Sequence, residues 1–116
     1  MNEWRELKLV TKALGGVARL TIVYHLARQE SITVTALTEL LGISQPLLSW
    51  HLRKLRKAGL VQTRRAGRQV YCYLNHARYQ FWLSRMEQLI DPQLQLSQDA
   101  LPSGEALMEA DMGVEG

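Results

Sequence analysis

The segment Ile43–Leu74, ISQPLLSWHLRKLRKAGLVQTRRAGRQVYCYL, combines a run of cations with residues that begin and end short structural elements. No acidic residue occurs between Glu39 and Glu87. Within Trp50–Val70 the chain places seven arginine and lysine residues. A basic run of this density predicts a polyanionic partner, and nucleic acid is the common one.

The first half of this segment predicts a helix that follows a tight turn. Gly42 ends the short helical pattern VTALTELL, because glycine readily adopts the left-handed conformation found at helix ends. Ser44 is a candidate N-cap, and Pro46 costs no hydrogen bond in the first turn of a helix. We therefore expect a helix over residues 45–58, which Gly59 ends.

The second half predicts two β-strands. LVQTRR and QVYCYL each alternate residues between two faces, and the AGR between them contains the glycine that hairpin turns favour. A helix, a turn, a second helix and a basic hairpin form the layout of a winged helix-turn-helix.

Three further helices complete the predicted fold. Apolar periodicity predicts helices over 4–14, 17–29 and 76–90, with ESIT as a link after the second of them. The fold class is therefore mostly α with a small β-hairpin, in the order α-α-α-α-β-β-α. The stripes that we expect to face the core comprise Leu20, Val23, Tyr24 and Ala27 in the second helix, and Leu37, Leu40 and Leu41 in the third.

Charge divides the 116-residue chain into two parts. Residues 1–90 hold all fourteen arginine and lysine residues with five acids, whereas residues 91–116 hold six acids and no base. We expect one domain over 1–91 and an acidic, disordered tail over 92–116, in which GEALMEADM could form a transient helix.

Composition also indicates the compartment. The single cysteine, Cys72, excludes an internal disulfide and fits a reducing cytoplasm. No apolar run approaches the roughly 18 to 20 residues that cross a bilayer. The N-terminal MNEWRELKLV lacks the pattern of a signal peptide. We expect a cytoplasmic protein with no membrane partner.

The helix over 45–58 has one apolar face and one basic face. At about 100° per residue, Leu48, Leu52 and Leu55 lie together and are predicted to hold the helix against the core. The other side chains therefore face outward. The opposite face carries Pro46, Trp50, Arg53, Lys54 and Lys57, with Gln45, Leu47, Ser49, His51 and Arg56 on the flanks.

An outward helix of this kind fits the major groove of B-DNA, where its first residues usually reach the base edges. Gln45 could pair with adenine, Arg53 with guanine, and Ser49 with either base. Leu47 could meet a thymine methyl group, and the lysines further along the helix could meet phosphate. The candidate DNA-binding residues are Ser44, Gln45, Pro46, Leu47, Ser49, Trp50, His51, Arg53, Lys54, Lys57, Arg64, Arg65 and Arg68.

The roles of Trp50 and His51 stay open. Trp50 could stack on a sugar or press against a thymine methyl group. Alternatively, the helix is rotated and Trp50 packs under the predicted hairpin, which is the wing of a winged helix-turn-helix. His51 lies only about 60° from Leu48 around the helix, which favours a partly buried, hydrogen-bonded side chain over a base contact.

The sequence LTELLGISQPLLSWHLRKLRKAGLVQTRRAGRQVYCYL resembles the ArsR/SmtB family of bacterial winged-helix repressors. The similarity covers about residues 8–90, and its strongest marks are SQ, S.HL..L..AGLV, the hairpin RAGRQVYCYL and the pair Arg19-Leu20. The resemblance implies a homodimer, joined by the first and last helices, that binds an inverted-repeat operator. It assigns the residues named above to a recognition helix and a wing.

The outer helices independently favour a dimer. Helices 4–14 and 76–90 each carry large apolar side chains, and the intervening residues form too small a core to cover both stripes. Two-fold pairing would place two recognition helices one turn of DNA apart, ~34 Å. The candidate interface residues are Trp4, Leu7, Thr11, Leu14, Tyr79, Trp82, Leu83, Met86, Leu89 and Ile90.

The metal-ligand motifs of the family are not matched. Metal-sensing members place a Cys-Val-Cys triplet before the turn, where this chain has Thr33-Val34-Thr35. Other members bind zinc across the last helix, where this chain has His76, Arg78 and Leu89. We therefore expect no metal and no cofactor, and the sequence does not identify a small-molecule effector.

The leading interpretation is a DNA-binding transcriptional regulator, a homodimeric repressor that does not sense metals. The alternative is a protein-interaction module whose basic face docks an acidic partner or the chain's own acidic tail. An enzyme is not expected, because the sequence has no glycine-rich phosphate loop, no paired catalytic carboxylates and no Ser/His/Asp arrangement.

Overall fold

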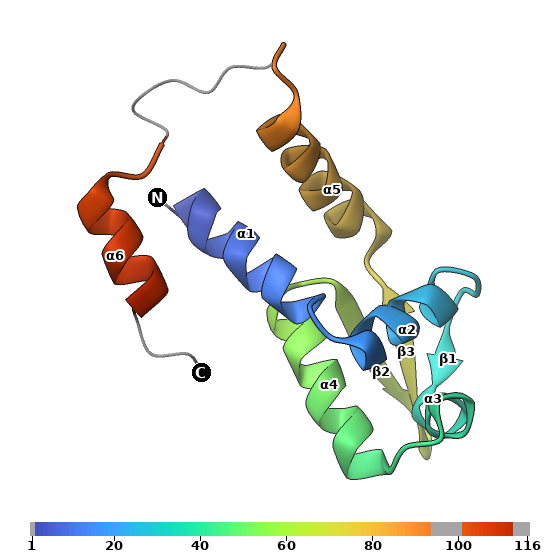
Figure 1. Ribbon diagram of the computed structural model, residues 1–116. Coiled ribbons are helices and arrows are strands. Elements are labelled where there is room, and N and C mark those ends of the chain that lie inside the picture. The colour runs from blue at the N-terminus through green and yellow to red at the C-terminus, as the bar shows by residue number, and fades with distance from the viewer. Residues whose placement is uncertain (1, 94–100, 113–116) are drawn as a thin grey trace.

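The computed structural model describes residues 2–93 and 101–112, which form helices around a small sheet (Figure 1). The winged helix-turn-helix order that the sequence predicts is confirmed. The helices are α1 (Asn2–Ala13), α2 (Val17–Leu26), α3 (Val34–Leu41), α4 (Gln45–Lys57), α5 (His76–Ile90) and α6 (Gly104–Met112). The strands are β1 (Ile32–Thr33), β2 (Val61–Ala66) and β3 (Gln69–Leu74).

The sheet has three antiparallel strands in the order β1-β3-β2. Strands β2 and β3 form the predicted hairpin, and Gly67 takes the first position of its two-residue turn with a φ of 63°. The strand β1 was not predicted: Ile32 pairs with Cys72 where the sequence suggested only a link. This short strand ties the segment before α3 to the hairpin.

The core lies where α2, α3 and α4 meet the sheet. The predicted anchors of α4 are confirmed, because Leu48, Leu52 and Leu55 are all buried. Leu37 of α3 is buried as well, but Leu40 is 51% exposed, contrary to the prediction. Burying one such aliphatic side chain contributes about 1.5–3 kcal/mol to folding.

The predicted buried face of α2 is partly wrong. Leu20, Tyr24 and Ala27 are exposed, whereas Ile22 and Leu26 are fully buried beside the predicted Val23. The helix carries apolar residues on nearly every side, so periodicity alone could not identify the face that the core covers.

Helices α1 and α5 lie side by side and are joined by two salt bridges (Figure 1). Glu6 meets Arg78 at 3.1 Å, and Glu3 meets Arg85 at 3.3 Å. Trp82 of α5 is 2% exposed and belongs to the core. The two outer helices therefore pack on each other within one chain.

The acidic C-terminal segment contains α6, which coincides with GEALMEADM. Residues 94–100 and 113–116 lie outside the described residues, so the division into a domain over 1–91 and a disordered tail over 92–116 stays a prediction. Among the helices of residues 2–93 and 101–112, none is long and apolar enough to span a membrane.

Candidate nucleic-acid interface

The turn before α4 is built from local interactions that the sequence predicts. Gly42 has a φ of 68°, and its N–H donates to the Thr38 carbonyl at 2.8 Å. The Ser44 hydroxyl accepts a hydrogen bond from the N–H of Leu47 at 3.3 Å, which confirms it as the N-cap. This turn directs α4 outward along the surface.

Helix α4 presents its polar face to solvent. Gln45, Pro46, Ser49, Arg53 and Lys57 are exposed, as predicted. Leu47 is 43% exposed near the start of the helix. The buried leucines on the opposite side hold this orientation, so the face that is predicted to enter the major groove is accessible.

A groove of about 320 Å³ lies between α4 and the hairpin. Gln45 and Ser49 line it from the helix, and Arg65 and Arg68 line it from the wing. Arg56 also lines the groove, and its guanidinium donates to the Thr63 hydroxyl at 3.2 Å. The tertiary fold thus brings polar side chains and cations from two separate elements to one place.

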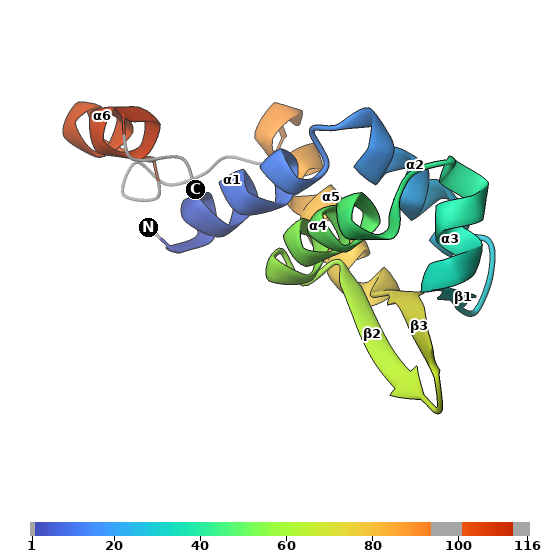
Figure 2. The same cartoon turned by 90° about the horizontal axis from the view of Figure 1, so that it is seen from below.

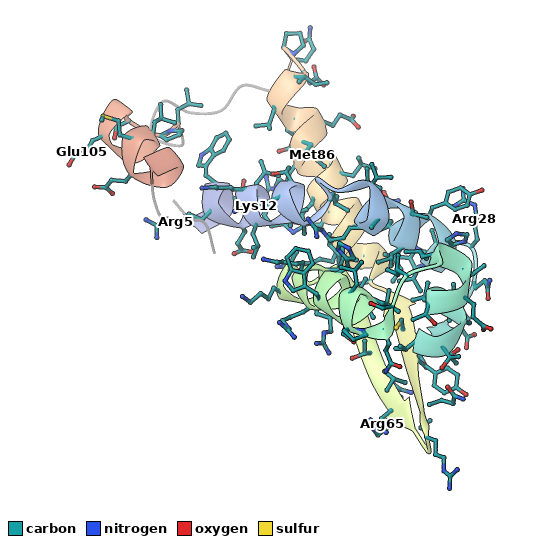
Figure 3. All side chains as sticks on the ribbon, turned by 60° about the horizontal axis from the view of Figure 1, so that its bottom comes forward. Arg5, Lys12, Arg28, Arg65, Met86 and Glu105 are labelled. Carbon is teal, nitrogen blue, oxygen red and sulfur yellow. The ribbon has the colours of Figure 1, made fainter. Side chains whose placement is uncertain are left out.

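The wing projects away from the helices (Figure 2), with Arg65 on the hairpin (Figure 3). Successive residues of a strand point to opposite faces. Arg65 therefore faces the groove, whereas Arg64 lies over the ring of Tyr73, 5.7 Å from its centroid. Arg64 and Arg65 serve different sides of the wing.

Trp50 faces α1 and not the wing. It lines a second groove together with Leu9 and Ala13 of α1, and it is 44% exposed. The guanidinium of Arg19 and the ammonium of Lys54 lie 5.5 and 5.1 Å from its ring centroid. The alternative in which Trp50 packs under the wing is therefore wrong.

His51 is partly buried and hydrogen-bonded, as predicted. Its Nδ1 lies 3.0 Å from a guanidinium nitrogen of Arg19, whose Nε donates to the Ala13 carbonyl at 2.6 Å. Because a guanidinium can only donate, Nδ1 must be the unprotonated acceptor. Burial, with a smaller contribution from the Arg19 charge, lowers the pKa of His51 below its ordinary value of 6.5.

The residues at the family's metal positions make other contacts in this structure. The Thr33 hydroxyl caps α3 by accepting from the N–H of Ala36 at 3.1 Å. At the start of α5, Arg78 pairs with Glu6. Over the described ranges, no three His, Cys, Asp or Glu side chains gather as a metal site would require.

The candidate dimer residues divide into two groups. Leu7 and Trp82 are buried within the single chain, and Trp4, Leu14, Tyr79 and Met86 are partly buried against the same core. The others are exposed: Thr11, Leu83, Leu89 and Ile90. Sequence reasoning missed further exposed apolar side chains, which are Val17, Leu20 and Tyr24 of α2 and Phe81 of α5.

Comparison with known proteins identifies the family. A family model described as bacterial regulatory protein, arsR family, matches residues 17–63. The arsenic resistance transcriptional regulator ArsR1 of Pseudomonas putida is 36% identical over 103 residues, which cover 87% of this chain and 80% of that protein. The chain belongs to the ArsR family.

Solved structures of transcriptional regulators share its fold. An ArsR-like transcriptional regulator from Rhodococcus sp. RHA1 has a TM-score of 0.69 at 25% identity, covering 77% of this chain and 83% of that one. The transcriptional repressor BigR from Xylella fastidiosa has a TM-score of 0.58 at 32% identity, covering 79% and 90%. As an ArsR-family member, the protein is a DNA-binding transcriptional regulator and not an enzyme.

Proposed function

We propose that this ArsR-family chain is a homodimeric repressor that binds an inverted-repeat operator with α4 of each protomer in successive major grooves. The groove between α4 and the wing carries the proposal, because Gln45 and Ser49 lie there with Arg65 and Arg68. Side chains that can read bases thus stand beside cations that can bind phosphate. Occupation of a promoter by the dimer would block transcription.

Individual roles follow from position on α4 and the wing. Arg53, exposed on the outer face, is suited to a bidentate contact with guanine. Lys57 near the end of the helix and Arg68 at the hairpin turn are suited to phosphate. The Ser44 hydroxyl already accepts a hydrogen bond from Leu47, and it can still donate to a phosphate oxygen.

The exposed apolar side chains of α5 support a dimer. Leu83, Leu89 and Ile90 are 44%, 46% and 82% exposed. In sedimentation, the Leu83→Glu/Ile90→Glu variant should run as a monomer where the parent runs as a dimer. Leu40→Glu changes an equally exposed leucine on α3 and should leave the dimer intact. A monomeric parent protein would refute the two-fold arrangement.

We expect the signal that controls operator binding to be something other than a metal. Thr33 and Thr35 supply no thiolate where other members have cysteine, and Thr33 is used as a helix cap. Addition of Zn²⁺ or arsenite should therefore leave operator affinity unchanged. A regulator that acts on a bacterial chromosome works in the cytoplasm, which agrees with the expected location.

The decisive experiment is a selection of binding sites from random duplex DNA, followed by affinity measurements over a range of salt concentrations. The logarithm of affinity should fall with the logarithm of salt concentration, by about 0.9 for each neutralised phosphate. Arg53→Ala should relax base preference at one position of each half-site, whereas Lys57→Ala should weaken all sequences alike. A flat salt response would instead favour a protein-interaction module.

A further inference from the structure

A second cationic groove, of about 430 Å³, lies between α1 and α4 on the side of α4 away from the wing. Among the residues that the structure describes, no acidic side chain lines it. The cations that line it are Arg5, Lys8 and Lys12 of α1, Arg19 of α2, and Lys54 and Lys57 of α4. The groove therefore attracts an anion, and it shares two lysines with the proposed DNA-binding face.

Helix α1 carries its acidic and basic side chains on different sides. Glu3 and Glu6 reach toward α5, where each forms a salt bridge with an arginine. Arg5, Lys8 and Lys12 follow one another at helical spacing and line the groove. Figure 3 labels Arg5 and Lys12 on α1. Glu3 and Glu6 of α1 therefore lie on the α5 side of the helix, whereas Arg5, Lys8 and Lys12 lie on the groove side.

Part of the groove lining is apolar. Trp50 and Leu9 line it, and they are 44% and 43% exposed. Because the groove combines an exposed tryptophan face with cations, it suits a segment that offers both apolar side chains and carboxylates. The occupant that fits is an acidic peptide with exposed apolar side chains.

The chain carries such a peptide. Helix α6 places Glu105 and Glu109 one turn apart, and its Leu107 and Met108 are 49% and 62% exposed. Residues 91–116 contain no base that could neutralise their six acids. This segment therefore complements the groove in charge and in apolar character.

The acidic segment can reach the groove. Figures 1 and 2 place α6 near the amino-terminal end of α1, where Arg5 lines the groove. Residues 91–104 can extend over roughly 40 Å. Helix α1, with 12 residues, is only about 18 Å long. This contour length is long enough for α6 to reach any part of the groove.

We propose that the acidic segment around α6 docks in the groove between α1 and α4 and there competes with DNA for Lys54 and Lys57. Docking weakens DNA binding most at low salt and for non-specific sequences, whose affinity is almost wholly electrostatic. The effect on DNA rests on the proposed function, whereas the docking itself does not.

The first test changes the acids of α6 in the full chain. Glu105→Gln/Glu109→Gln should tighten binding to non-specific duplex DNA about three- to tenfold at low salt, because two carboxylates no longer hold the groove. The matched control, Glu30→Gln/Glu39→Gln, removes the same charge from exposed positions that do not line the groove. Equal effects of the two pairs would overturn the proposal.

The second test asks whether removing two lysines of the groove weakens or tightens DNA binding. If Lys8 and Lys12 bind DNA directly, Lys8→Gln/Lys12→Gln weakens DNA binding. If they hold the acidic segment, the same change leaves DNA binding unchanged or tightens it, and adding Glu105→Gln/Glu109→Gln then has no further effect. Weaker binding with full additivity would overturn the proposal.

A third test detects docking without DNA. A spin label on Leu101→Cys should broaden the indole resonance of Trp50, which Trp50→Phe assigns, and Lys8→Gln/Lys12→Gln should remove the broadening. Cys72 is buried and escapes labelling. An unaffected indole signal would overturn docking even if the protein binds DNA. The signal would also be unaffected if a small anion or a second copy of the chain filled the groove. Broadening without any DNA binding would uphold docking and reject the proposed function.

Discussion

Arg19 of α2 and His51 of α4 are joined by a hydrogen bond of 3.0 Å, and the same guanidinium donates to the Ala13 carbonyl at the end of α1. One side chain thus connects three helices. It lies beside Trp50, 5.5 Å from the ring centroid, and so contributes to the groove between α1 and α4. The position of the proposed recognition helix relative to α1 depends on this contact.

Arg19→Ala should lower the free energy of unfolding by about 1–3 kcal/mol, because it leaves a partly buried carbonyl and an imidazole without their charged donor. Urea denaturation provides the measurement. The control is Arg28→Ala: Arg28 follows the end of α2, where its guanidinium donates to the Tyr24 carbonyl at 2.7 Å and lies 3.5 Å from the centroid of the Tyr24 ring, at an exposed site. That change should stay within about 0.5 kcal/mol. A loss for Arg28 as large as that for Arg19 would contradict the proposed link between helices.

The stability of the protein should fall as the pH is lowered through 6.5. Burial and Arg19 lower the pKa of His51 in the folded state, so the unfolded chain binds the proton first as pH falls. The contribution of His51 to stability is complete above its ordinary pKa of 6.5, and it is lost as the pH falls toward the lowered pKa of the folded state. His51→Gln keeps an acceptor for Arg19 but cannot titrate. The parent should therefore lose more stability than the variant when the pH is lowered from 7.5 to 5.5. An equal loss in the two proteins would reject the assignment.

Gly59→Ala should destabilise the fold by about 1–3 kcal/mol. Gly59 has a φ of 76°, and a Cβ there would lie 3.0 Å from Nε of Arg78. Thermal denaturation should show the loss. Adding Arg78→Ala relieves the crowding but not the backbone strain, so at most part of the loss should return. Gly104→Ala adds a Cβ in open space and should leave the midpoint unchanged.

Cys72 should resist alkylation in the native protein at pH 8. The side chain is fully buried, and burial raises the pKa of its thiol to about 11, with a smaller opposing influence from Arg56. The reactive thiolate is therefore scarce and inaccessible. Iodoacetamide labelling followed by mass spectrometry should show modification only when denaturant unfolds the chain. Rapid labelling of folded protein would mean that β3 opens readily.

Elements with strong local signals could be predicted from the sequence alone. The bounds predicted for α5, residues 76–90, agree with His76–Ile90, and Gly42 and Ser44 correctly marked the turn before α4. These signals are local because a left-handed glycine and a capping hydroxyl act on groups within a few residues of themselves. The outward face of α4 also followed, since its three buried leucines share one narrow stripe.

Only the tertiary structure decided which surfaces meet. The strand β1 exists because β3 offers it an unpaired edge, and no two-residue pattern could reveal that. The buried face of α2 depends on which neighbours cover a helix that is apolar nearly all round. The groove that joins Gln45 to Arg68, and the one that joins Lys12 to Trp50, bring together residues far apart in sequence. Local chemistry specifies the helices and turns of this ArsR-family protein, whereas contacts between distant segments, which no short stretch encodes, create its candidate binding surfaces.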